Sequence, residues 1–149
     1  MNTHIKSIPL DVPSHAERTF IKNYQTITRG TNRIFIFSAD QKIGHLNADF
    51  FGADIPPEVN GPEHIFAIAQ KIPIGAFATH LGLIARYGRT FHSIPYLVKM
   101  DGITNLVPRT AQDPLSIPLW DVDQVVEVQK NSNITCVGIG YTVYLGSQF

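Results

Sequence analysis

Residues 74–100 read IGAFATHLGLIARYGRTFHSIPYLVKM, and this stretch decides the fold class of the chain. Its first apolar run, Ile74–Ala78, predicts a buried β-strand. Apolar residues then recur at helical spacing over Leu81–Tyr87, and Gly88 is typical of a residue that ends a helix. A second apolar run, Tyr96–Met100, predicts another strand. This order predicts a right-handed βαβ unit with parallel strands.

The same alternation continues on both sides of this stretch. Ser14 and Glu17 fit a capping box, which predicts the start of a helix, and Gly30 predicts its end. Asp121 and Gln124 predict a similar cap for a later helix. We expect further helices over 14–29, 62–72 and 121–131, and further strands over 33–37 and 134–144. The strand over 33–37 is expected to be buried on both faces.

Two architectures can hold parallel strands and helices in this order. An open doubly wound sheet usually has a glycine-rich turn after its first strand, and residues 38–44, SADQKIG, do not show one. The pattern therefore favours a (β/α)8 barrel of the TIM type. Four strands make about half of such a barrel. We expect one domain over 1–149, with an N-terminal extension and helix over 1–32 and strands one to four, with their helices, over 33–149.

The amino-acid composition argues against some classes of binding partner. The chain has 149 residues, 44% of them hydrophobic, and its 12 basic and 12 acidic residues cancel. This balance indicates neither a nucleic-acid partner nor an anionic membrane surface. No apolar stretch is long enough to span a bilayer. The single cysteine, Cys136, lies in an apolar run and predicts a buried thiol. We expect a cytoplasmic protein.

Active sites of such barrels lie at the carboxyl ends of the strands, so polar residues just past each apolar run are candidates. Asp40, Gln41, Lys42 and His45 follow the first strand. A carboxylate and an imidazole there can act as acid, base or substrate contacts. The alternative is a solvated loop in which Asp40 bonds its own backbone.

Lys99 and Asp101 form the second cluster. They are two residues apart, so both project to the same side of the third strand. A partly desolvated lysine suits either Schiff-base chemistry or the binding of a phosphate oxygen. The alternative is a lysine whose stem lines apolar surface while its ammonium stays in water.

Other polar residues give weaker signals. Tyr141 and Tyr144 lie in the predicted fourth strand and are interpreted as core residues with one hydrogen-bond partner each. The alternative is that Tyr141 donates a proton. His80 follows the second strand and is interpreted as a helix-start residue. The histidines lack the spacing of a zinc site.

Taken together, three segments resemble successive blocks of class I fructose-bisphosphate aldolases of the archaeal and bacterial type. They are Phe35–His45, Pro95–Thr104 and Val137–Ser147, and the resemblance extends over about 33–149. It implies a TIM barrel that cleaves fructose 1,6-bisphosphate to dihydroxyacetone phosphate and glyceraldehyde 3-phosphate. The reaction of that family passes through a lysine Schiff base and uses no metal or other cofactor.

The resemblance also implies roles for single residues. Asp40 matches a substrate-facing aspartate, His45 a substrate-binding histidine, and Lys99 a lysine that holds substrate oxygens. Asp101 is expected to bind substrate, although the family usually has asparagine at its position, and Gln41 stands where it usually has histidine. The imine-forming lysine and the tyrosine proton donor of the family belong to the sixth and fifth strands, so neither role passes to Tyr141 or Tyr144.

Three functions remain open at this level. The first is a part of such an aldolase that is inactive by itself, with a sugar phosphate as substrate. The second is a related ketol-transfer synthase or thiolase of the same family. The third is a non-catalytic half-barrel that self-associates, because the open edges of a four-stranded parallel sheet favour homo-oligomers.

Overall fold

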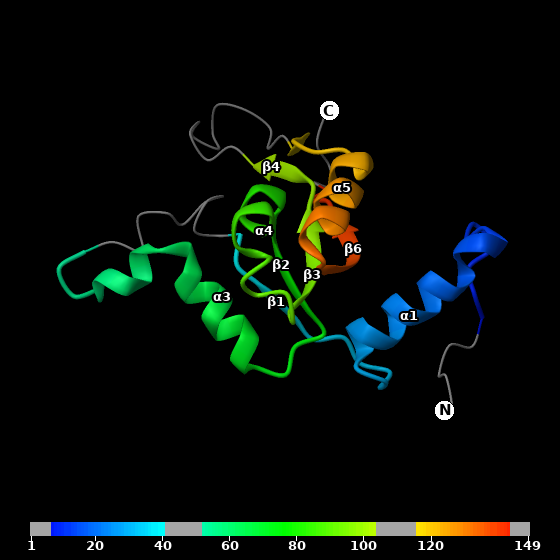
Figure 1. Cartoon of the computed structure of the whole chain (residues 1–149), viewed down its shortest axis with the longest axis horizontal. Coiled ribbons are helices and arrows are strands. Elements are labelled where there is room, and N and C mark those ends of the chain that lie inside the picture. Colours follow the sequence, from blue (N-terminus) through cyan, green and yellow to red (C-terminus); the bar gives the residue numbers. More distant parts are fainter. Residues whose placement is uncertain (1–6, 41–51, 104–115, 144–149) are drawn as a thin grey trace.

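A parallel sheet of four strands forms the centre of the molecule (Figure 1). The computed structural model describes residues 7–40, 52–103 and 116–143. The sheet order is β1-β2-β3-β6, and every neighbouring pair is parallel. The strands are β1 (Ile36–Ser38), β2 (Ala76–His80), β3 (Pro95–Lys99) and β6 (Thr135–Gly140). The predicted parallel sheet is therefore confirmed, with strand ends that differ from the predicted ones by up to four residues.

Helices connect the strands in the predicted order. They are α3 (Pro62–Lys71), after a 3₁₀ turn at Pro57–Asn60, then α4 (Leu81–Tyr87) and α5 (Val122–Ser132). At the start of α5, the Asp121 carboxylate accepts a hydrogen bond from the backbone N–H of Gln124 at 2.8 Å. The Gln124 side chain accepts one from the Asp121 N–H at 3.0 Å. This reciprocal cap confirms the predicted capping box.

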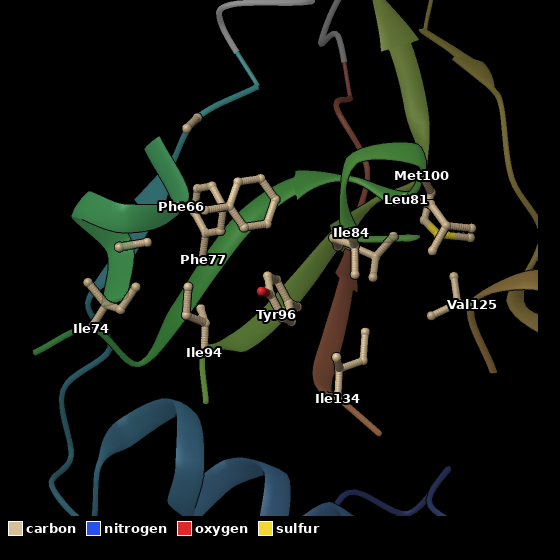
Figure 2. Close-up of a cluster of buried hydrophobic side chains, with 13 residues drawn as sticks. Phe66, Ile74, Phe77, Leu81, Ile84, Ile94, Tyr96, Met100, Val125 and Ile134 are labelled. Atoms are coloured by element: carbon tan, nitrogen blue, oxygen red, sulfur yellow. The ribbon is translucent and has the colours of Figure 1, made fainter. Parts of the chain in front are cut away.

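The hydrophobic core lies between these helices and one face of the sheet (Figure 2). Phe66 of α3, Phe77 of β2 and Tyr96 of β3 are almost completely buried. The Phe66 ring meets the Phe77 ring edge to face, with the centroids 4.9 Å apart. Aromatic pairs in this geometry contribute about 0.5–1.5 kcal/mol beyond the burial of their area. Leu81 and Ile84 of α4 extend the same core.

The first strand differs from its prediction. It begins at Ile36, and Ile34, Phe35 and Ile36 are 57%, 58% and 38% exposed. The expectation that this strand is buried on both faces is therefore wrong for the described residues. The physical reason is its place at the edge of the sheet, where only β2 pairs with it. Apolar side chains at this edge are available to another element.

A small second sheet follows β3. It pairs β4 (Asp101–Ile103) with β5 (Ser116–Pro118) in antiparallel fashion, in a segment where the sequence predicted no strand. The backbone N–H of Leu119 donates to the carbonyl of Met100 at 2.8 Å, and that of Met100 donates to the carbonyl of Gly140 at 3.0 Å. These bonds attach the small sheet to the carboxyl ends of β3 and β6.

The N-terminal helix, α1 (Glu17–Thr28), follows a 3₁₀ turn at Ser14–Ala16. No side chain caps the start of either element, so the capping box predicted for Ser14 and Glu17 is wrong, because Ser14 lies inside the 3₁₀ turn. The end of α1 is left-handed as predicted at Gly30, with φ of 70°, and Arg29 also adopts this conformation, with φ of 54°.

The end of α1 approaches the sheet very closely at Gly75. A Cβ atom at this glycine would collide with the backbone carbonyl oxygen of Ile27. The Gly75 N–H donates to the carbonyl of Phe35 at 2.8 Å, so the backbone is also held from the side of the first strand. Only glycine fits here without a shift of α1.

We expect Gly75→Ala to lower the free energy of unfolding by about 1–3 kcal/mol, because the methyl group must displace backbone. Urea unfolding followed by circular dichroism measures this change. Gly138→Ala is a matched control, since a Cβ at Gly138 meets nothing within 4 Å. Equal stability of the two variants would contradict the close approach.

None of the helices in the described part of the chain is long and apolar enough to cross a membrane.

Candidate functional site

Four residues form one layer at the carboxyl end of the parallel sheet. The register pairs His80 of β2 with Lys99 of β3, and Lys99 with Gly140 of β6. Asp40 follows the last residue of β1 by two positions, which brings it level with His80. Paired residues of neighbouring parallel strands present their side chains on the same face. This layer is where barrel enzymes place their active sites.

Lys99 is the centre of the polar contacts in this layer. Its Nζ lies 3.1 Å from Asp40 Oδ2 and 3.8 Å from Asp101 Oδ1. It also donates a hydrogen bond to Thr142 Oγ1 at 2.9 Å. The side chains of Lys99 and Asp40 keep only 13% and 15% of their surface exposed. Solvent screens the charges of such partly buried pairs less than those of surface pairs. Because so little of the Lys99 side chain is exposed, the structure does not support the alternative in which its ammonium lies in bulk water.

Asp40 is held in place by Ser38 at one carboxylate oxygen and by Lys99 at the other. Burial by itself raises the pKa of its carboxyl, but hydrogen bonds from Ser38 and Lys99, together with the Lys99 charge, bring the pKa below its usual value. The Ser38 hydroxyl donates to Asp40 Oδ1 at 2.8 Å. Asp40 is therefore an ionised carboxylate at neutral pH. It also bonds its own backbone, as the alternative predicted, but with 15% of its side chain exposed and Lys99 at 3.1 Å it is not a solvated loop residue.

Asp101 is completely buried at the start of β4. The Ser116 hydroxyl of β5 donates to its Oδ2. Burial again raises the pKa, but the Ser116 hydrogen bond, the Lys99 charge and contacts with Thr142 more than offset this, so the pKa of Asp101 is lowered. The small antiparallel sheet thus positions a second carboxylate against Lys99.

The lowered pKa of Asp101 predicts a loss of stability in acid. Because the folded pKa lies below the unfolded one, the unfolded chain binds more protons as the pH falls. The free energy of unfolding therefore decreases from about pH 4 downward, through the folded pKa, by up to about 1.4 kcal/mol per proton and pH unit. We expect Asp101→Asn to flatten this dependence in urea unfolding between pH 2 and 5. Asp123→Asn, at an exposed position outside the site, is the matched control, and a parent-like slope in Asp101→Asn would contradict the assignment.

His80 is the site residue that the sequence interpretation missed. Only 8% of it is exposed, and the charges that act on it are those of Asp40, Lys99 and Asp101. Burial lowers the pKa of its imidazole and Lys99 adds to this, while Asp40 and Asp101 oppose it. The ring is therefore neutral at neutral pH. The signal in the sequence is its position at a strand end, but the residue is also the N-cap of α4, which accounts for a histidine at this position without a role in the site.

Tyr141 and Cys136 are the remaining candidates that the structure describes. His45, Gln41, Lys42 and Tyr144 lie outside the described residues. Tyr141 is 51% exposed and lies beyond the end of β6, so its interpretation as a core residue is wrong. Cys136 is half-buried, and burial raises the pKa of its thiol to about 11.

The described residues contain no group of three side chains that could hold a metal ion. What they do contain is a lysine ammonium between two carboxylates, with a neutral imidazole beside it. The ammonium can attract phosphate or hydroxyl oxygens. A carboxylate at this position can accept or return a proton.

Residues 34–148 match the family model described as DeoC/LacD family aldolase, and the chain belongs to this family. Among its relatives is a protein of Methanocaldococcus jannaschii named fructose-bisphosphate aldolase/6-deoxy-5-ketofructose 1-phosphate synthase. The two are 46% identical over 142 residues, which are 95% of this chain and 45% of that protein. The predicted resemblance to class I fructose-bisphosphate aldolases is confirmed.

Solved structures show the same relationship. The fructose-bisphosphate aldolase of Slackia heliotrinireducens superimposes with a TM-score of 0.91 and 42% identity over 99% of this chain and 46% of that one. An archaeal fructose 1,6-bisphosphate aldolase gives a TM-score of 0.65 and 25% identity over 87% of this chain and 46% of that one. The chain thus spans about half the length of the relatives it matches, which confirms the predicted fold class of half a barrel.

Proposed function

We propose that this chain forms the substrate-binding side of a class I fructose-bisphosphate aldolase. The reaction is the cleavage of fructose 1,6-bisphosphate to dihydroxyacetone phosphate and glyceraldehyde 3-phosphate through a lysine Schiff base. The observation that carries the proposal is the contact of Lys99 with Asp40 and Asp101 at the carboxyl end of the sheet. Membership in the aldolase family supports the choice of reaction.

Each residue of the cluster has a role in this proposal. Lys99 binds substrate oxygens through its ammonium, and Asp40 faces the sugar chain, where its carboxylate can accept a proton from a hydroxyl. Asp101 is buried and bonded to Ser116, so it holds Lys99 and binds substrate through it. His45 is proposed as a further substrate contact on the resemblance alone.

Lys99 is not the imine-forming lysine in this proposal. The Lys99 nitrogen is engaged by the Asp40 and Asp101 carboxylates at 3.1 and 3.8 Å and by the Thr142 hydroxyl at 2.9 Å, an arrangement that suits a residue that binds substrate oxygens. The imine lysine is assigned to the sixth strand of a complete barrel and the tyrosine donor to the fifth. By themselves, residues 1–149 are then expected to bind the sugar phosphate without cleaving it.

Reductive trapping tests this division of roles. We expect that incubating the chain with dihydroxyacetone phosphate and sodium borohydride adds no mass, because no lysine of these residues forms the imine. Intact-mass spectrometry and peptide mapping measure the result. Lys99→Met, treated in parallel, accounts for labelling of surface lysines. An adduct at Lys99 in the parent chain would show that Lys99 is the nucleophile and would contradict the proposal.

A second candidate is a ketol-transfer synthase of the same family. It is favoured by the double name of the Methanocaldococcus jannaschii relative, which pairs the aldolase with 6-deoxy-5-ketofructose 1-phosphate synthase. Both functions use a phosphorylated ketose, so the cluster around Lys99 serves either. Calorimetric titration with fructose 1,6-bisphosphate and with a 6-deoxy ketose 1-phosphate distinguishes them by relative affinity.

A further inference from the structure

His80 occupies one of the four positions of the strand-end layer, and its side chain has no assigned role. The register pairs it with Lys99, whose ammonium contacts Asp40. The carbonyl of Gly140, in the same layer, accepts a hydrogen bond from Met100. Only the imidazole of His80 is left unexplained among these positions.

The helix-start interpretation accounts for the backbone of His80 but not for its side chain. His80 is the N-cap residue of α4, with φ of −71° and ψ of 146°, and its side chain makes no capping hydrogen bond. Its Nε2 is buried and has no hydrogen-bond partner in the described part of the chain. A buried polar atom without a partner costs about 1–3 kcal/mol, so its retention calls for an explanation.

The surroundings of the imidazole indicate the chemistry of its partner. The charges that act on His80 are two carboxylates, Asp40 and Asp101, and one ammonium, Lys99. Two carboxylates disfavour a phosphate next to the imidazole, and the phosphate has the Lys99 ammonium to bind. A neutral imidazole has one donor and one acceptor nitrogen, which suits an uncharged hydroxyl or carbonyl oxygen.

We propose that His80 is a specificity-determining residue that hydrogen-bonds a hydroxyl or carbonyl oxygen of the ligand's sugar chain through Nε2. This inference rests on the proposed function, because it requires a sugar phosphate in the site. Nε2 is buried, so the contact requires the ligand to displace a neighbouring side chain. The site then distinguishes a sugar phosphate from phosphate alone.

The test compares two ligands on three variants by calorimetric titration. His80→Phe keeps the size of the ring and removes both nitrogens, whereas His80→Gln keeps a polar group near the position of Nε2. His92→Phe is the matched control, because His92 is exposed and lies outside the site. We expect His80→Phe to weaken fructose 1,6-bisphosphate by about five- to thirty-fold. Binding of inorganic phosphate should change less than two-fold, and His80→Gln should recover part of the loss.

Each outcome bears on the proposal differently. Unchanged fructose 1,6-bisphosphate affinity in His80→Phe would overturn the role of His80 and leave the proposed function standing. Equal weakening of both ligands would also overturn it, because a structural role affects them alike. If the parent chain binds neither ligand, the proposed function fails and the inference fails with it. Should His80→Phe not fold, His80→Leu, which also removes both ring nitrogens but is smaller, takes its place in the same comparison.

Discussion

Replacing Lys99 by methionine is expected to weaken fructose 1,6-bisphosphate binding by about ten- to a hundred-fold. The change removes the only cation that contacts both Asp40 and Asp101 in the described residues while keeping the length of the side chain. A hydrogen bond to a charged group contributes about 1.5–3 kcal/mol, and 1.4 kcal/mol corresponds to a factor of ten in affinity. The loss has a second cause, since two unneutralised carboxylates then repel the ligand phosphates. Isothermal titration calorimetry measures the change directly.

Lys71→Met is the control for this prediction. Lys71 is an exposed lysine in the last turn of α3, away from the strand-end layer, so its replacement should leave the affinity unchanged. Inorganic phosphate should follow the same order as the bisphosphate, because Lys99 is proposed to bind phosphate. Equal affinities of the parent and Lys99→Met would show that the lysine serves only to neutralise Asp40 and Asp101, and the proposed substrate role would be lost.

The main sheet could be predicted because its signals are local. Each of the runs at 74–78 and 96–100 is apolar enough to indicate a strand, and each intervening helix has its own stop residue. The β4–β5 pair could not be predicted in this way. Its strands are three residues long, and they are stabilised by pairing across a segment of twelve residues that carries no strand pattern. A local sequence pattern does not specify the register of such a long-range pair of strands or its position next to β3.

Prediction of the site from the sequence has the same limit, because contacts between distant residues decide which side chains belong to it. Asp40, Lys99 and Asp101 were found because charged residues just past an apolar run stand out, and the structure brings all three together. His80 follows the same rule, but in the sequence alone a helix start is sufficient to explain it. Its membership of the site depends on the cross-strand pairing with Lys99. Ser116 could not be predicted for a similar reason, since it hydrogen-bonds Asp101, which lies fifteen residues earlier in the chain.

The two edge strands of the sheet are where further strands could pair and complete the site. Ile34 and Phe35 beside β1, and Ile139 of β6, are exposed apolar residues at the two edge strands. In a barrel, such strands pair with further strands, which would also surround the layer of Asp40, His80 and Lys99. The predicted homo-oligomer would be another way to cover these edges, and it stays a prediction.

Phe66→Ala is expected to lower the free energy of unfolding by about 3–5 kcal/mol. Phe66 is only 1% exposed and its ring contacts four other rings, those of Phe77, Tyr87, Phe91 and Tyr96. Truncation leaves a cavity between α3 and the sheet that these rings cannot fill without leaving their own contacts. Because total stabilities are only about 5–15 kcal/mol, the variant is expected to be partly unfolded at room temperature. Urea unfolding followed by tryptophan fluorescence and circular dichroism measures the loss.

Ile68→Ala separates core packing from helix propensity in the same element. Ile68 lies on α3 and is 38% exposed, so its truncation should cost no more than about 1 kcal/mol. Phe66→Leu should fall between the two, since it retains apolar volume but loses the edge-to-face contact with Phe77. If Phe66→Ala and Ile68→Ala were equally stable, α3 would not be docked on the sheet through Phe66. The strand-end layer would then not depend on this core, because β2, which carries both Phe77 and His80, would be positioned by its neighbouring strands alone.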